Sequence, residues 1–313
     1  MLKVLKPGLF STIQDAGRIG YQQYGIIVSG VMDQVSFRIG NALLNQSNKA
    51  AIEMTLIGGT FQFTKQTTIV LTGGEMRATL NNKAIPMYKP IAIKANDILT
   101  CGAINNGTRS YLCIAGGLCV MDVLGSKSTY LRAKLGGIQG RALKVGDEVL
   151  YNESTLHFYN AKQYYLPNIL YREQPIRVLT GTEWDEISAS AQHLFVNQTY
   201  SLSLESDRMG YRLHTPTPIP FKNPFHLLSE AVTFGTVQLP PSGQPIILMA
   251  DRQTTGGYPK IAQVIAADLH RLAQLRPTST LQFEIVTLEQ AEAALVRLEQ
   301  HLRLLQIVTS EAK

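Results

Sequence analysis

Most of the chain alternates short apolar runs with turn residues, which is the pattern of β-strands. The runs are rich in β-branched and aromatic residues, and paired glycines or asparagines separate many of them. The clearest runs cover residues 60–64, 69–72, 77–80, 91–93, 110–114, 176–179 and 281–286. Many short strands at this spacing are typical of sheets and barrels, so we expect a mainly β fold with a few short helices.

Helical periodicity is confined to three segments. Residues 33–44 place their apolar side chains on one broad face, and Asp33 can cap the first turn. Residues 261–275 also repeat apolar positions at helical spacing. Residues 288–305 carry a leucine stripe, and Thr287 with Gln290 matches a capping box. The stripe predicts packing of this last helix onto its own domain.

The length is consistent with two domains or with one large β domain, and the pattern favours two β domains. A chain of 313 residues exceeds the usual size of one hydrophobic core. The periodicity weakens between residues 152 and 174, which predicts a boundary there. We therefore expect two barrel-like halves followed by a helix: an N-terminal β domain (residues 1–160), a C-terminal β-barrel domain (residues 175–287) and a C-terminal helix (residues 288–313).

Short fragments recur in the two halves. Residues 70–75 (VLTGGE) resemble residues 178–183 (VLTGTE), and residues 18–21 (RIGY) resemble residues 208–211 (RMGY). Glu53 and Glu230 also stand at the same distance before a glycine. The matches do not keep one order along the chain, so they suggest related barrels without demonstrating a tandem duplication.

Charge and cysteine content exclude several classes of protein. The net charge of +6 is spread along the chain, which argues against nucleic-acid binding. No run of about eighteen apolar residues occurs, and the N-terminus lacks a signal-peptide pattern, so we expect a cytoplasmic protein without membrane contact. Cys101, Cys113 and Cys119 are odd in number and lack metal-binding spacing, which predicts buried, inert thiols.

The first candidate site is the turn at residues 29–33 (SGVMD). It opens the first expected helix, so its backbone N–H groups can hold a carboxylate or phosphate, and Ser29 can add a hydroxyl. The alternative is that Asp33 simply caps the helix while Arg18 pairs with Asp15.

The second candidate is residues 206–212 (SDRMGYR). Arg208 and Arg212 suit planar carboxylates or phosphates, because a guanidinium donates two parallel hydrogen bonds. Structural ion pairs use the same residues, and both interpretations stay open.

The third candidate is the loop at residues 251–260 (DRQTTGGYPK), which follows an apolar run of strand length. Its polar side chains are expected to converge on a ligand. Lys260 is expected at the start of a helix, where the dipole disfavours a cation, so it should face an anion or have a lowered pKa. A salt bridge between Asp251 and Arg252 would leave the other polar residues unexplained, namely Gln253, Thr254, Thr255, Tyr258 and Lys260.

Several catalytic motifs are absent. Residues 124–129 (LGSKST) resemble a phosphate loop only weakly, because Val120 stands where a Walker A motif requires glycine. No GxGxxG follows a strand, and neither HExxH nor GxSxG occurs. The six histidines are scattered, so we expect no metal centre.

The motifs resemble one family. Six segments are similar, in the same order, to segments of the KipA and allophanate-hydrolase-subunit-2 family. They are STIQDAGRIGYQQYGI, SGVMDQVSFRIGNALL, LTGGEM, LGSKSTYLRAKLGGIQGRALKVGD, SDRMGYRL and GTVQLPPSGQPIILMADRQTTGGYPKIAQVIAADL. The resemblance covers roughly residues 2–286, with Val28 in place of the proline usual before Ser29 and Gly30. It implies cyclophilin-like β-barrels, related to the carboxyltransferase part of urea carboxylase.

The resemblance also implies a function. Free-standing members resemble the C subunit of an ATP-dependent 5-oxoprolinase, an enzyme that opens 5-oxo-L-proline to L-glutamate. The resemblance implies two partner subunits: a KipI-like B subunit and a LamB/YcsF-like A subunit. ATP is then expected to be bound jointly with, or by, those partners. The predicted catalytic residues are Asp33, Asp251 and Lys260, with one of the two aspartates as general base. The predicted substrate-binding residues are Ser29, Arg208, Arg252, Gln253, Thr254, Thr255 and Tyr258.

Two other functions stay open at this point. One is a biotin-dependent carboxyltransferase of the urea carboxylase type, which would use carboxybiotin on a separate carrier. The other is a KipA-type regulator that antagonises an inhibitor of a sensor kinase and performs no chemistry.

Overall fold

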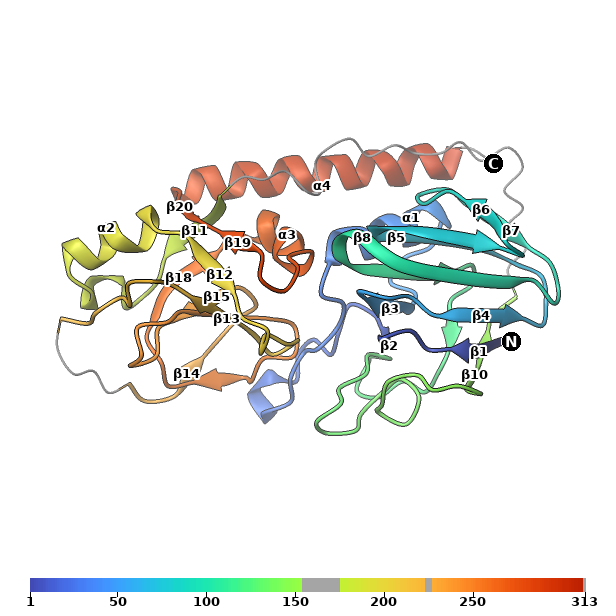
Figure 1. Ribbon diagram of the computed structural model, residues 1–313, viewed down its shortest axis with the longest axis horizontal. Helices are drawn as coiled ribbons and strands as arrows, with labels where there is room; N and C mark the ends of the chain where they lie inside the picture. The colour runs from blue at the N-terminus through green and yellow to red at the C-terminus, as the bar shows by residue number, and fades with distance from the viewer. Residues whose placement is uncertain (154–174, 223–226, 312–313) are drawn as a thin grey trace. The chain divides into compact units, whose positions relative to one another are not determined.

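The computed structural model describes residues 1–153, 175–222 and 227–311, which form two compact units. The first unit comprises residues 1–19, 29–153 and 300–311, and the second comprises residues 20–28, 175–222 and 227–299. Each unit is built on its own antiparallel-dominated sheet (Figure 1). The domain boundary predicted near residues 152–174 falls almost entirely outside the described residues.

The first unit contains a ten-stranded sheet with the order β2-β3-β8-β4-β1-β10-β9, and β5 pairs with β6, β7 and β8. Its strands are β1 (Leu2–Lys6), β2 (Phe10–Gln14), β3 (Ala51–Thr55), β4 (Thr60–Phe63), β5 (Thr67–Leu80), β6 (Lys83–Ile85), β7 (Ile91–Ile93), β8 (Ile98–Ile114), β9 (Leu118–Cys119) and β10 (Glu148–Tyr151).

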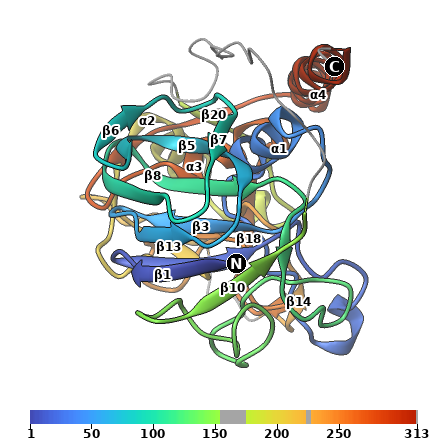
Figure 2. The ribbon, with the colours of Figure 1, turned by 90° about the vertical axis from the view of Figure 1, so that its right-hand side faces the viewer.

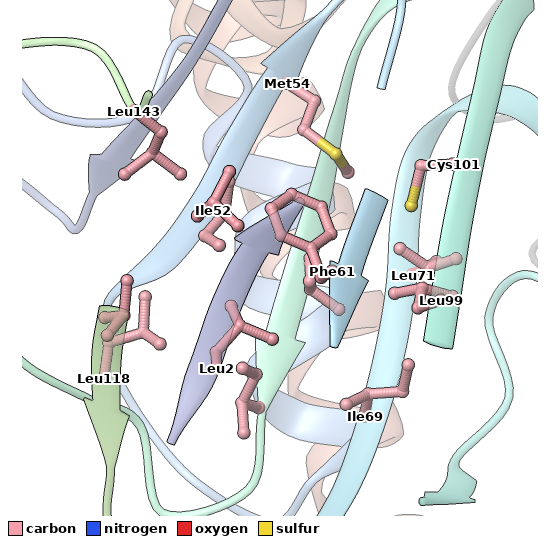
Figure 3. Packing of buried hydrophobic residues seen from close by; sticks show 14 of the residues in the cluster. Leu2, Ile52, Met54, Phe61, Ile69, Leu71, Leu99, Cys101, Leu118 and Leu143 are labelled. Atoms are coloured by element: carbon pink, nitrogen blue, oxygen red, sulfur yellow. The ribbon is translucent and has the colours of Figure 1, made fainter. Parts of the chain in front are cut away.

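The core of this unit comes from alternate positions of these strands. Leu2, Ile52, Phe61 and Leu99 are fully buried in one hydrophobic cluster (Figure 3). Each buried side chain of this size contributes about 1.5–3 kcal/mol relative to exposure. Helix α1 (Gln34–Leu43) contacts β5 and β8, as Figure 2 shows, and the predicted helix at residues 33–44 is confirmed.

Strand β5 corrects one sequence prediction. Residues 69–72 and 77–80 were expected as separate strands, with Gly73 and Gly74 as a turn. The structure joins them into one strand whose pairing with β8 shifts register after Gly73. Gly73 has φ +94°, and a Cβ there would lie 2.4 Å from the carbonyl oxygen of Arg109. The glycine therefore marks a β-bulge where two backbones approach closely, not a chain reversal.

The second unit contains an eight-stranded sheet with the order β19-β12-β13-β16-β15-β18-β11-β20, and a two-stranded ribbon of β14 and β17. Its strands are β11 (Ile176–Thr180), β12 (Tyr200–Leu202), β13 (Gly210–His214), β14 (Glu230–Ala231), β15 (Thr236–Gln238), β16 (Ile246–Leu248), β17 (Thr255–Gly256), β18 (Lys260–Val264), β19 (Thr280–Leu281) and β20 (Phe283–Ile285). The sheets curve as a half-barrel and a nearly closed barrel, so the mainly β, barrel-like prediction is confirmed.

The helix predicted at residues 261–275 is wrong over its first half. Residues 260–264 form β18, which lies between β11 and β15 in the sheet. Only the short elements η3 (Ala266–Asp268) and α3 (Leu269–Ala273) are helical. Ile261, Ala262 and Val264 are all buried, because a central barrel strand is covered on both faces. Such a run has no alternation to distinguish it from a buried helix.

The remaining helical elements are short, apart from α4. They are η1 (Gln22–Tyr24), η2 (Trp184–Glu186), α2 (Ala189–Asn197) and α4 (Leu288–Glu311). The capping box of α4 is confirmed, because Thr287 N donates to Gln290 Oε1 at 2.9 Å and Gln290 N donates to Thr287 Oγ1 at 3.3 Å.

The predicted leucine stripe of α4 is only half buried. Leu302 and Leu305 are buried, whereas Leu288 and Leu295 are exposed. Within the second unit, the helix packs through Ala291, Ala294 and Leu298 onto a cluster formed by Leu179, Ile265, Ala267 and Val286. Within this unit the contact is therefore made by two alanines and by one leucine of the stripe.

The cysteine prediction holds for two thiols of three. Cys101 and Cys113 are buried, and burial raises the pKa of each thiol to about 12. Cys119 is exposed, because it points outward from the edge strand β9 while Leu118 points inward. Within residues 1–153, 175–222 and 227–311, no helix has both the length and the apolar character needed to cross a membrane.

A matched pair of glycine substitutions tests the bulge in β5. Gly73→Ala adds both left-handed strain and a backbone clash, whereas Gly146→Ala, at φ +86° with no atom within 4 Å of its Cβ, adds only strain. We expect Gly146→Ala to cost about 1–2 kcal/mol and Gly73→Ala about 1–3 kcal/mol more. Urea unfolding of the two variants measures the difference. Equal costs would show that the approach to Arg109 does not constrain the strand.

Candidate functional site

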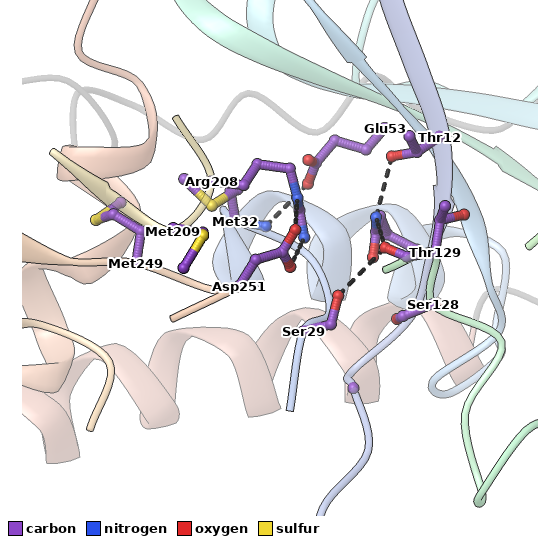
Figure 4. Close-up of polar contacts among 12 residues, drawn as sticks. Thr12, Ser29, Met32, Glu53, Ser128, Thr129, Arg208, Met209, Met249 and Asp251 are labelled. Atoms are coloured by element: carbon purple, nitrogen blue, oxygen red, sulfur yellow. Dashed lines mark hydrogen bonds and ion pairs between the residues drawn. The ribbon is translucent and has the colours of Figure 1, made fainter. Parts of the chain in front are cut away.

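The turn at residues 29–33 is packed against its own unit. Ser29 has φ +56°, and its hydroxyl donates to the carbonyl of Thr129 at 3.3 Å. A Cβ on Gly30 would lie 3.0 Å from the carbonyl group of Ala16, so the turn requires glycine there. The Thr129 carbonyl accepts a second hydrogen bond, from Gln14 Nε2 at 3.1 Å, and Figure 4 shows Ser29 beside Thr129. Ser29 is thus buried and oriented by backbone contacts.

The anion expected at the start of α1 is the protein's own Glu53. Its carboxylate accepts from Met32 N and from the hydroxyl of Tyr111, both at 2.8 Å. The Tyr111 hydroxyl in turn accepts from Asp33 N at 2.8 Å. Burial, with the nearby acidic groups, holds the pKa of Tyr111 well above its usual range, so the phenol stays protonated and donates to Glu53.

Asp33 performs the capping role that the sequence predicts. Its carboxylate accepts from Ser36 N at 2.9 Å and from Ser36 Oγ at 2.6 Å, and the residue is fully buried. This network stabilises the first turn of α1. A role of Asp33 as general base stays a prediction, and it would require these bonds to Ser36 to be exchanged for a bond to substrate.

The loop that weakly resembles a phosphate loop also holds a carboxylate of the chain. Asp15 accepts from Ser126 Oγ and Lys127 N, both at 2.6 Å, and from Ser128 Oγ at 2.5 Å. The Arg18 guanidinium donates to the carbonyl of Ser128 in the same loop. Asp15 therefore occupies the position that a bound phosphate would need.

In the second unit, Arg208 and Asp251 form a bidentate ion pair, shown in Figure 4. Arg208 Nε and Nη2 each lie 2.9 Å from a different oxygen of Asp251, and both side chains are nearly buried. Asp251 N also donates to the carbonyl of Arg208 at 2.7 Å. The structural interpretation of Arg208 is therefore supported, and the salt bridge considered between Asp251 and Arg252 is replaced by this one.

Arg252 is the exception among the cations of the loop. Its side chain is 7% exposed, lies 5.9 Å from the ring centroid of Phe234, and donates weakly to the Met249 carbonyl at 3.4 Å. Among the described residues, its Nε has no hydrogen-bond partner and no carboxylate lies at ion-pair distance. Burial lowers the pKa of the guanidinium to about 10, opposed by Asp251, so it remains charged at neutral pH.

Lys260 begins strand β18, so its predicted place at a helix start is wrong. It does face anions, as predicted, but they belong to the chain. Its ammonium forms an ion pair with Glu230 and lies 3.7 Å from Glu183, whose other oxygen accepts from Lys260 N at 2.7 Å. Lys260 and Glu183 are 13% and 11% exposed, and Glu230 is 51% exposed.

The other polar residues of the loop do not converge on one point. The Thr254 carbonyl accepts from Val232 N, and Thr255 lies on β17 opposite Ala231 of β14. Gln253 and Thr254 are half-buried, whereas Thr255 and Tyr258 are exposed. These contacts attach the loop to the β14–β17 ribbon, and the predicted substrate-binding roles of the four residues stay predictions.

Sequence reasoning missed the two glutamates beside Lys260. A signal was present, because Glu183 ends one of the recurring fragments and Glu230 shares its spacing to a glycine with Glu53. The structure gives these acids contacts that the fragments alone do not reveal. Glu53 binds the start of α1, whereas Glu183 and Glu230 bind a lysine.

Metal ligation has no candidate in the described part of the chain. Within residues 1–153, 175–222 and 227–311, no group of three or more His, Cys, Asp or Glu side chains is arranged to hold an ion.

Comparison with known proteins gives consistent relatives. The chain is 42% identical over 292 residues to the C subunit of 5-oxoprolinase from Haemophilus influenzae and 39% identical to that of Escherichia coli, with 93% of each protein covered. The solved structure of urea carboxylase from Kluyveromyces lactis matches 97% of the chain with a TM-score of 0.89 and 30% identity, although the match spans only 29% of that longer chain. Residues 24–285 match the model of one family. The chain belongs to the family described as carboxyltransferase domain, subdomain A and B.

Proposed function

We propose that the chain is the C subunit of an ATP-dependent 5-oxoprolinase, a cytoplasmic complex that converts 5-oxo-L-proline to L-glutamate. The 42% identity to a protein of that name, over 93% of both chains, supports this proposal. The two expected partners are a KipI-like protein and a LamB/YcsF-like protein.

The reaction requires stabilisation of negative charge. A lactam resists water because its amide is resonance-stabilised. Transfer of the terminal phosphoryl group of ATP to the lactam oxygen makes the carbon a better electrophile. Water then adds to this carbon, and the C–N bond breaks as the nitrogen takes up a proton. A second water hydrolyses the acyl phosphate that remains, which releases phosphate and leaves the new carboxylate. Both the substrate carboxylate and the phosphoryl oxygens need cationic partners along this path.

Arg252 is the structural observation that supports binding of an anionic group in this loop. Arg208 is already paired with Asp251, and Lys260 with Glu183 and Glu230. Arg252 alone among these three cations is buried without a carboxylate. A buried charge that lacks a partner is costly, and an incoming carboxylate or phosphoryl group would remove that cost.

Lys260 and Glu230 are the best placed of these residues for proton transfer. Glu230 is half exposed, so solvent can reach the ion pair through it, whereas the nearly buried Glu183 holds the ammonium of Lys260 in place. By contrast, the carboxylates of Asp33 and Asp251 are engaged by Ser36 and Arg208. We therefore favour Glu230 over both predicted aspartates as general base, with Lys260 holding it in place.

Nucleotide binding is assigned to the complex. The loop at residues 124–129 already holds Asp15, and it also lacks the first glycine of a Walker A motif. A phosphate-binding contribution from the KipI-like or the LamB/YcsF-like partner is therefore part of the proposal.

A biotin-dependent carboxyltransferase is the second candidate function. The TM-score of 0.89 to urea carboxylase, over 97% of this chain, favours it. The acceptor would then take a carboxyl group from carboxybiotin on a separate carrier, and Arg252 would bind that carboxylate. An avidin blot of proteins that co-purify with the chain detects such a carrier.

The first prediction concerns the assembled complex. We expect the chain, co-expressed and purified with its KipI-like and LamB/YcsF-like partners, to form glutamate from 5-oxoproline only when ATP is present. Glutamate release and ADP release should be equal and should both depend on 5-oxoproline. An intact complex of the three proteins without turnover would exclude this function, and a biotinylated partner on the blot would favour carboxyl transfer.

The second prediction separates the two buried arginines. Arg252→Met removes an uncompensated charge, so the free energy of unfolding of the isolated chain should be unchanged or higher by up to about 2 kcal/mol. Turnover of the complex should fall by about 10²–10³-fold. Arg208→Met removes the bidentate partner of the buried Asp251, which should cost about 3–5 kcal/mol of stability. Similar losses of stability in both variants would make Arg252 a structural residue.

The third prediction concerns the Lys260 cluster. Lys260→Ala and Glu230→Gln should each lower turnover by at least about 10²-fold while the complex still assembles. Lys94→Ala, which removes an exposed lysine in the first unit, is the control and should leave turnover unchanged. Steady-state assays and size-exclusion chromatography measure both quantities. Normal turnover in Glu230→Gln would rule out this glutamate as the base.

A further inference from the structure

A groove of about 320 Å³ lies on the second unit, and Tyr258 lines it, whereas Arg252 and Lys260 do not. Its walls come from the outward face of β13, the turn at residues 240–245 and the side chain of Tyr258. The volume is at the lower end of the roughly 300–1,000 Å³ of small-molecule sites. It therefore suits a ligand of amino-acid size.

The sheet register separates this groove from Arg252. Arg212 on β13 pairs with Ile246 at the first residue of β16, and Gly210 pairs with Leu248 at its last. Arg212 and Ile246 line the groove, whereas Arg252 follows the opposite end of β16. Arg212 and Arg252 therefore lie near opposite ends of strand β16.

The polar groups of the groove are available to a ligand. The Arg212 guanidinium approaches the Glu205 carboxylate only to 4.0 Å, and their side chains are 59% and 82% exposed. An exposed pair at that distance contributes little to stability. The Tyr258 hydroxyl makes no hydrogen bond to any described residue, and the side chain is 45% exposed. A cation, an anion and a phenol therefore border one cavity without being needed by the fold.

The frame around these groups is rigid. The Gln244 side chain accepts from Thr215 N at 2.8 Å and donates to the Thr215 carbonyl at 3.1 Å, which fastens the turn to the chain beyond β13. Pro240 and Pro245 line the cavity and fix their own backbone angles. A preformed wall of this kind lowers the entropic cost of binding.

We propose that this groove binds a small α-amino acid. The ligand carboxylate accepts hydrogen bonds from Arg212 and from the hydroxyl of Tyr258, and the ligand ammonium donates to Glu205. The ligand's carbon chain lies against the apolar surface of Pro240, Pro245 and Ile246. Opposite charges on neighbouring sides of the cavity match a zwitterion better than a simple anion.

Titration calorimetry of the isolated full chain tests this proposal with two probes. L-glutamate and glutarate both carry two carboxylates on a five-carbon chain, and only L-glutamate carries the ammonium group. We expect L-glutamate to bind at least about tenfold more tightly than glutarate, because an ammonium–carboxylate hydrogen bond is charge-assisted. No detectable binding of L-glutamate, or equal binding of the two probes, would overturn the proposal.

Variants assign the binding to the groove. Arg212→Gln should weaken L-glutamate binding by about tenfold or more, and Glu205→Gln should bring its affinity close to that of glutarate. Arg297→Gln, which removes an exposed arginine on α4 outside the groove, is the matched control and should bind normally. Binding that survives Arg212→Gln would place it elsewhere and refute the site. Because these measurements need neither ATP nor partner proteins, their outcome is independent of the turnover of the complex.

Discussion

The bidentate ion pair of Arg208 and Asp251 fixes the start of the polar loop in the second unit. It joins the segment before β13 to Asp251, which lies three residues after the end of β16, so the loop leaves the sheet at a defined point. Arg252 follows Asp251 directly and is buried beside Phe234. With the anchoring carboxylate taken by Arg208, the next guanidinium is left charged and uncompensated. Among the described residues, the pairing of Arg208 with Asp251 thus leaves the neighbouring Arg252 without a carboxylate of its own.

The first unit uses the same chemistry with the opposite result. The start of α1 and the loop at residues 126–128 both present converging donors, the arrangement that binds phosphate in many proteins. Here Glu53 occupies the first and Asp15 the second. Donors that are already satisfied by internal carboxylates rigidify the unit instead of recruiting a ligand. The contrast with Arg252 shows why a donor-rich turn alone does not identify a binding site.

The sequence predicts this fold better than it predicts the site. Strands at β4 and β11, the cap by Asp33 and the capping box of α4 all follow from local patterns and are confirmed. The failures at β5 and β18 arise from tertiary context. A glycine pair can make a bulge or a turn, and a fully buried strand has no alternation to reveal it. The site depends on which charges pair across distant segments, such as Lys260 with Glu183 and Glu230, and no spacing rule contains that information.

The β14–β17 ribbon adds a last constraint on how Lys260 works. Each strand of the ribbon contributes two residues, and its register places Glu230 opposite Gly256. The ribbon has few backbone hydrogen bonds, so it holds Glu230 less firmly than β18 holds Lys260, because β18 is paired with a strand on each side. Of the two carboxylates on the lysine, Glu183 is nearly buried and also binds the lysine's backbone, whereas Glu230 is half exposed. Glu230 is consequently the partner whose carboxylate can move at low cost, as a general base beside a bound substrate must, while Glu183 keeps the ammonium of Lys260 in place.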